Sequence, residues 1–120
     1  MAEILIIDDE PAIRDLLVRV RHKAGHTGYE AGDGDEGIEL FRQVHPALVI
    51  TDIVMPGMEG IEVIRRLRQA DPTVPILAIS GSGASLYLRA ATTLGATAAL
   101  AKPFEIAELL SLVGRLLNTV

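Results

Sequence analysis

Five residues of the types that handle phosphoryl groups follow short apolar runs in this 120-residue sequence: Asp8 and Asp9, Asp52, Ser80, and Lys102. A carboxylate such as Asp52 can act as a nucleophile and carry a covalent acyl phosphate. Carboxylates held close together cannot all stay ionised without a cation, and Mg²⁺ is a hard ion that prefers oxygen ligands. A lysine and a hydroxyl could then neutralise and hydrogen-bond phosphoryl oxygens. These residue types predict phosphoryl transfer, provided that the fold brings them together.

The apolar runs predict the strands that would position these residues. Continuous β-branched runs, typical of strands buried on both faces, occupy Ile4–Ile7, Ala47–Ile50 and Ile76–Ile79. Thr27–Ala31 predicts a weaker edge strand, and Ala98–Ala101 predicts a strand of small residues. Each predicted strand therefore ends just before one of the polar positions or before a turn.

Segments with helical periodicity separate these runs, and helix signals mark their limits. Pro11 suits the start of a helix, Gly25 and Gly95 suit helix ends, and Asp71-Pro72 would interrupt a helix. Five β-α units of this length predict an α/β fold with a doubly wound parallel sheet, helices on both faces and right-handed crossovers. The strand order 2-1-3-4-5 would place the first and third strands side by side, and with them Asp8, Asp9 and Asp52.

The whole chain is expected to form one domain, residues 1–120, because neither a linker nor an internal repeat is evident. Hydrophobic residues make up 49% and charged residues 22%, a globular composition. A net charge of −5 argues against a direct nucleic-acid partner. The N-terminus does not read as a signal peptide, and no apolar run approaches the roughly 20 residues of a membrane span. We expect a cytoplasmic protein without a membrane partner.

Each polar position also has an ordinary structural explanation. Asp9 could cap the helix that begins at Pro11, Ser80 could be a turn residue, and Lys102 could be a solvated surface residue. Taken together these explanations fail, because four strand ends would have acquired complementary chemistry by chance.

Four segments, in their order and spacing, resemble the signature of response-regulator receiver domains: Ile7–Glu10, Asp52–Gly60, Ser80–Gly81 and Lys102–Phe104. The resemblance covers essentially the whole chain. It implies a flavodoxin-like fold and a signalling switch that catalyses only its own phosphorylation and dephosphorylation. The phosphoryl donor would be the phosphohistidine of a sensor histidine kinase or of a histidine phosphotransfer protein.

The resemblance also implies a role for each site residue. Asp52 would be the phosphoacceptor, and it would bind Mg²⁺ together with Asp9 and the backbone carbonyl of Val54, while Asp8 would act through water. The residues that contact the phosphoryl group would be Lys102, Ser80 and Gly81. The bond before Pro103 would be cis, which is uncommon for X–Pro bonds.

One position departs from the family pattern. Receivers commonly carry Tyr or Phe three residues before the lysine, and this chain has Ala99 there. Phosphorylation would be unaffected, but the usual relay to the face formed by the fourth helix, fifth strand and fifth helix is in doubt. The apolar run Leu86–Leu88 cannot all face inward on one helix, so this face would suit a downstream effector protein or domain, or a dimer.

Two alternative functions, an aspartyl-phosphate phosphatase and a flavin-binding electron carrier, would each need a different sequence after the first strand. A phosphatase with an aspartyl-phosphate intermediate usually has its nucleophile after the first strand and a second Asp two residues later, a spacing that Asp8–Pro11 lacks. A flavin-binding electron carrier would need a Ser/Thr/Gly-rich loop at the same place. The sequence ends at Val120 without an output domain, so we expect either a stand-alone receiver or a piece of a longer regulator.

Overall fold

The computed structural model describes residues 2–53, 60–81 and 85–118, with the backbone alone for residues 85–88. Strands and helices alternate along the described chain. The strands are β1 Glu3–Ile7, β2 Thr27–Ala31, β3 Leu48–Asp52, β4 Ile76–Ser80 and β5 Ala98–Ala101. The helices are α1 Pro11–Lys23, α2 Gly34–Val44, α3 Gly60–Ala70, α4 Ser85–Leu94 and α5 Ile106–Leu117. Within the described residues no helix is both long enough and apolar enough to cross a bilayer.

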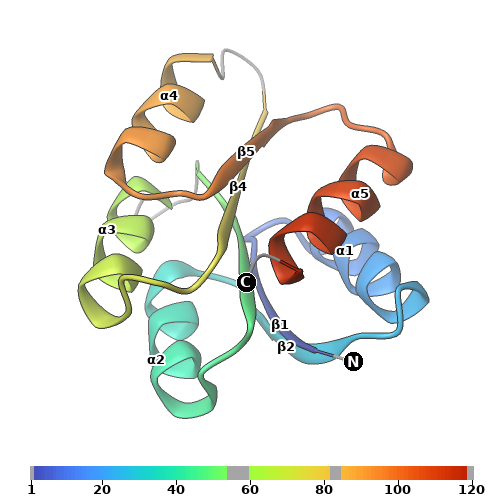
Figure 1. The fold of residues 1–120 in the computed structure, drawn as a ribbon, viewed down its shortest axis with the longest axis horizontal. Coiled ribbons are helices and arrows are strands. Elements are labelled where there is room, and N and C mark those ends of the chain that lie inside the picture. Colours follow the sequence, from blue (N-terminus) through green and yellow to red (C-terminus); the bar gives the residue numbers. More distant parts are fainter. Residues whose placement is uncertain (1, 54–59, 82–84, 119–120) are drawn as a thin grey trace.

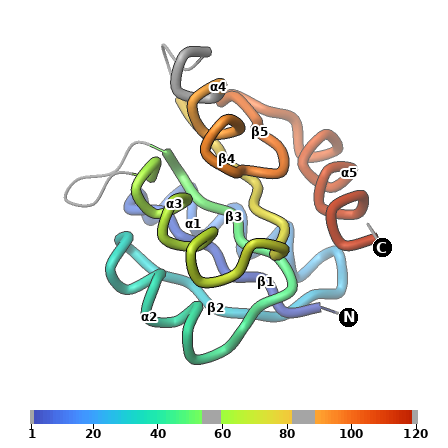
Figure 2. Tube along the Cα trace, turned by 60° about the vertical axis from the view of Figure 1, so that its left-hand side comes forward, coloured from blue at the N-terminus to red at the C-terminus, as the bar shows by residue number. Residues whose placement is uncertain are grey.

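The five strands form one parallel sheet in the order β2-β1-β3-β4-β5 (Figures 1 and 2). This confirms the predicted α/β architecture and its strand order. Strands β1 and β3 are neighbours, with Ile7 paired to Thr51. On the other side of β3, Asp52 is paired to Ile79 of β4. The carboxyl ends of the three central strands therefore meet at one edge.

Alternate strand residues face two separate hydrophobic cores, because successive side chains of a strand point to opposite faces. In β1, Leu5 and Ile7 pack with residues of α2, α3 and α4. Ile4 and Ile6 pack on the opposite face with residues of α1 and α5. All four side chains are fully buried. Burial on both faces explains why the strand sequences are continuous apolar runs rather than alternating ones.

Local signals set the helix limits where the sequence predicted them. Pro11 is the first residue of α1, where its missing N–H costs nothing. Gly25 and Gly95 follow α1 and α4 with φ of +85° and +126°, a region in which L side chains are strained. The segment that begins at Asp71 ends α3 at Ala70.

Strand β3 begins one residue later and ends two residues later than the predicted run Ala47–Ile50. Thr51 pairs with both β1 and β4, and Asp52 pairs with β4, so both residues remain in the sheet, and both are buried. Helix α3 begins close to this strand end, where the Gly60 N–H donates to the Ile53 carbonyl at 2.7 Å. A Cβ at Gly60 would lie 2.2 Å from the Asp52 carbonyl oxygen, so only glycine allows this approach.

Candidate functional site

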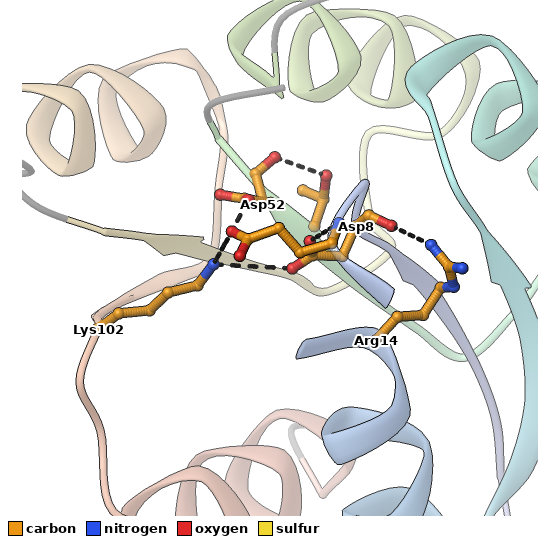
Figure 3. A network of polar contacts seen from close by, with 6 residues as sticks. Asp8, Arg14, Asp52 and Lys102 are labelled. Atoms are coloured by element: carbon orange, nitrogen blue, oxygen red, sulfur yellow. Dashed lines mark hydrogen bonds and ion pairs between the residues drawn. The ribbon is translucent and has the colours of Figure 1, made fainter. Parts of the chain in front are cut away.

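Asp8, Asp52 and Lys102 come together at the carboxyl edge of the sheet (Figure 3). The Lys102 Nζ lies 3.5 Å from Asp52 Oδ2 and 3.8 Å from Asp8 Oδ2. Asp8 directly follows β1, Asp52 ends β3, and Lys102 directly follows β5. The strand order therefore brings residues that are far apart in the sequence into one site, as the sequence predicted.

The Asp8 carboxylate is completely buried. Its Oδ1 accepts a hydrogen bond of 2.9 Å from the Glu10 N–H, and its backbone carbonyl accepts one of 2.7 Å from Arg14. Its Oδ2 has no hydrogen-bond partner in the described part of the chain. Burial raises the pKa of Asp8 to about 6; the Glu10 N–H opposes this shift, Asp52 reinforces it, and Lys102 opposes it.

Lys102 is the cation of the site, and its side chain is only 16% exposed. Burial by itself would lower its pKa, but the negative charges of Asp52, Asp8 and Glu10 raise it above the ordinary value. The Lys102 N–H donates to the Ser80 carbonyl at 2.7 Å, which fixes the start of the following loop against β4. The next peptide bond, to Pro103, is cis, as the resemblance implied.

Ser80 ends β4 and is fully buried. Its Oγ has no hydrogen-bond partner among the described residues, so a buried hydroxyl is left at this edge of the sheet. Gly81 follows it, and nothing lies within 4 Å of where a Cβ at Gly81 would be. Gly81 and Lys102 line a mostly apolar hollow of about 430 Å³ with four other residues, Ile13, Leu16, Pro103 and Phe104.

The other two predicted Mg²⁺ ligands are the carboxylate of Asp9 and the backbone carbonyl of Val54. Asp9 is partly buried, and its carboxylate is not among the three acids that converge at this edge. Val54 lies outside the described residues, so the expectation for its carbonyl stays a prediction. The same holds for the apolar patch expected at Leu86–Leu88, whose side chains are not described.

Glu10 is a site residue for which the sequence predicted no role. Its Oε1 lies 3.5 Å from Lys102 Nζ. The signal was the acidic run that follows β1, but the sequence does not reveal which of three consecutive acids turns toward the lysine. In the fold, Asp8 and Glu10 turn toward it.

The site fits a hard divalent cation. One carboxylate oxygen from each of Asp8, Glu10 and Asp52 lies within 4.8 Å of the other two. These are oxygen donors of the kind that Mg²⁺ prefers, and the buried Asp8 Oδ2 still lacks a hydrogen-bond partner in the described chain. Lys102 offsets only part of the negative charge, because among the described residues one ammonium group faces three carboxylates.

Fold and site together define a doubly wound α/β domain with an acidic site at the topological switch point of its sheet. A family model, the response regulator receiver domain, matches residues 4–114. The chain belongs to this family, whose members act in two-component signalling.

Known relatives agree with this assignment. The chain is 34% identical over 107 residues to sporulation initiation phosphotransferase F of Bacillus subtilis, across 89% of this chain and 86% of that protein. It is 33% identical over 115 residues to transcriptional regulatory protein TrcR of Mycobacterium tuberculosis, across 96% of this chain but 45% of that protein. Among solved structures, the receiver domain of NtrX from Brucella abortus matches with a TM-score of 0.94 at 31% identity, covering 98% of this chain and 100% of that one.

The relatives differ in length. The chain spans most of the Bacillus phosphotransferase but only about half of several transcriptional regulators, such as the 50% it covers of RpaA from Synechocystis.

Proposed function

We propose that residues 1–120 act as one receiver domain, a switch in which Asp52 accepts a phosphoryl group from a phosphohistidine in the presence of Mg²⁺. The observation that carries the proposal is the position of Asp52. Its carboxylate is 4% exposed, lies 3.5 Å from the Lys102 ammonium and converges with the carboxylates of Asp8 and Glu10. Such a site can offer a nucleophile and balance the charge of a phosphoryl group.

In the proposed transfer, a carboxylate oxygen of Asp52 forms a bond to phosphorus while the bond from phosphorus to the histidine nitrogen breaks. The electron pair of that bond stays on the imidazole. Hydrolysis reverses the modification: a water oxygen bonds to phosphorus, the bond from phosphorus to Asp52 breaks with its electron pair left on the carboxylate, and both water protons leave with inorganic phosphate as H₂PO₄⁻. The domain thus catalyses only its own phosphorylation and dephosphorylation.

The proposed Mg²⁺ ligands are Asp52, Asp9 and the Val54 carbonyl, with Asp8 acting through water. In the described residues Glu10, and not Asp9, converges with Asp8 and Asp52, so Asp9 would have to turn toward the ion when it binds. When bound, the ion would neutralise charge on the carboxylates and on the phosphoryl oxygens. Asp8 supports this proposal because its buried carboxylate has a raised pKa and would be favoured in its ionised form by a nearby cation.

Lys102, Ser80 and Gly81 are the proposed contacts to the phosphoryl oxygens. The Lys102 ammonium already lies beside the Asp52 carboxylate, and the Ser80 hydroxyl is buried at the end of the adjoining strand. At Gly81 the absence of a side chain leaves room beside the site. Phosphoryl oxygens can accept hydrogen bonds from an ammonium group, a hydroxyl and a backbone N–H.

The proposed output is a change in the face formed by α4, β5 and α5, which would control an effector protein, an output domain or a dimer contact. Ala99 belongs to this face and is partly buried against the core on the α2–α4 side of the sheet. The proposed location is the cytoplasm, where the kinase or phosphotransfer protein would present its phosphohistidine.

The test is phosphorylation by a small donor. Incubation with acetyl phosphate and Mg²⁺ should add a single phosphoryl group by intact mass, and Asp52→Asn should abolish the addition. Asp33→Asn is the matched control, because Asp33 is an exposed acid that caps α2 through the Glu36 N–H. This control should be phosphorylated like the wild type. An adduct that persists in Asp52→Asn would overturn the assignment.

A further inference from the structure

Glu10 occupies an unusual position for the residue that precedes a helix. It is the N-cap of α1, yet its side chain makes no capping hydrogen bond. The carboxylate instead lies beside Lys102, with Oε1 at 3.5 Å from Nζ. The Glu10 side chain is 60% exposed, compared with 16% for Lys102 and none for Asp8. Glu10 is therefore the outermost of the three acids around the lysine.

This position has two consequences for a phosphoryl donor. The donor approaches as an anion, and the exposed carboxylate of Glu10 opposes that approach through like-charge repulsion. The Lys102 ammonium must also turn toward a phosphoryl oxygen, and the ion pair with Glu10 favours its resting position. Both effects act before the phosphoryl group reaches Asp52, and both disappear if Glu10 loses its charge.

We propose that Glu10 is a specificity-determining residue that disfavours small, free anionic phosphodonors relative to a phosphohistidine carried by a docked protein. A docked protein gains binding energy from its own contacts, which can offset the repulsion, whereas a small anion has no comparable surface. The inference rests on the proposed phosphorylation of Asp52. It adds that the site itself limits phosphorylation by metabolites of the acetyl phosphate class.

The experiment compares Glu10→Gln with Glu39→Gln. Both substitutions remove one negative charge, but Glu39 is exposed on α2, where its carboxylate accepts a hydrogen bond from the Gln43 amide. Rates of phosphorylation by acetyl phosphate are followed by quenched intact mass, at Mg²⁺ concentrations shown by titration to saturate each variant. At low ionic strength Glu10→Gln should raise the second-order rate constant about two- to fivefold, the size expected for an exposed charge interaction. Glu39→Gln should match the wild type.

Two further arms separate charge from structure. The gain in Glu10→Gln should shrink toward none as salt screens the site, a response that a structural effect would not show. It should also be smaller with phosphoramidate, whose protonated nitrogen offsets part of the phosphoryl charge. Equal rates for Glu10→Gln and the wild type, or a gain that salt does not change, would overturn the role of Glu10. Failure of the wild type to be phosphorylated at all would instead overturn the proposed function.

Discussion

Asp8 is a buried acid whose ionised form is unfavourable in the folded, metal-free protein. Its carboxyl pKa is raised from 3.8 to about 6, chiefly by burial. The folded protein thus holds this proton more tightly than the unfolded chain does. The contribution of Asp8 to stability is therefore most favourable below pH 3.8, and it is lost as the pH rises through about 6. Near neutral pH the metal-free protein carries an ionised, buried carboxylate at a cost.

We expect Asp8→Asn to stabilise the metal-free protein at neutral pH. Because burial disfavours the ionised carboxylate, its removal should raise the free energy of unfolding by up to about 3 kcal/mol, and the gain should fade in acid. Urea denaturation in the presence of a chelator, over a pH series, measures it. The exposed Asp15→Asn on α1 is the control and should change little. Added Mg²⁺ should stabilise the wild type more than Asp8→Asn.

If Asp8→Asn instead lowers the free energy of unfolding at neutral pH, the ionised Asp8 carboxylate stabilises the folded protein. The attraction between Asp8 and Lys102 would then outweigh the burial of the carboxylate, and the site would not be strained in the absence of a metal.

The grouping of Asp8, Asp52, Ser80 and Lys102 at one edge could be predicted from the sequence, because strand ends and strand order determine where such residues lie. The orientation of neighbouring acids could not. Asp9 and Glu10 are adjacent, and their directions depend on how the chain turns from β1 into α1. Sequence patterns fix the existence of that turn but not the side-chain direction within it. The carbonyl expected from Val54 lies outside the described residues and stays a prediction.

Among the elements, the first residue of α3 approaches the Asp52 backbone closely at the end of β3. Gly60 is the first residue of α3, and a Cβ there would approach both the Asp52 carbonyl oxygen and the Ile53 Cα within 2.4 Å. These neighbours are backbone atoms and cannot rotate away. The close contact between the helix start and the strand end therefore depends on glycine.

Gly60→Ala should destabilise the protein by about 1–3 kcal/mol, the usual cost of forcing extra volume into a packed site. Gly114→Ala is the matched control, because Gly114 lies inside α5 with nothing within 4 Å of the added Cβ. It should stabilise the protein by roughly 0.4–1 kcal/mol through reduced freedom of the unfolded chain. Urea denaturation of both variants measures the contrast. Similar effects of the two substitutions would contradict the packing described for Gly60.

The end of β3 could not be predicted from the local sequence pattern. All five strands were predicted, but the β3 prediction stopped at Ile50, because Thr51 and Asp52 are polar and polar residues usually mark a strand end. They continue the strand because Thr51 pairs with the strands on either side of β3, and Asp52 pairs with β4. Position in the sheet is a tertiary property, which a local sequence pattern does not contain.

For the molecule as a whole, a change at Asp52 would have to reach the face formed by α4, β5 and α5 through residues near Ala99. Ala99 pairs with Ala78 across the β4–β5 ladder and packs against the core on the α2–α4 side. A methyl group has no alternative rotamers that could exchange with a moving hydroxyl. We therefore expect a change in this face to involve the backbone that follows Ser80.

We expect Ala99→Tyr to change the response of this face and to leave the phosphorylation rate nearly the same. An aromatic ring on β5 can adopt two packings, whereas the methyl group of Ala99 cannot. Amide NMR shifts on adding beryllofluoride and Mg²⁺ measure the response, and acetyl phosphate kinetics on the same variant provide the control. Identical shift changes in β5 and α5 of both proteins would argue that residue 99 takes no part.

The two edge strands also influence how copies of the protein meet. An exposed strand edge can template further strands from other chains, but both edges here are poor templates. Strand β2 contains Gly28 and the charged Glu30, whose ion pair with Arg21 ties it to α1, and β5 is only four residues long. We therefore expect these two strand edges to contribute little to pairing between copies of the protein.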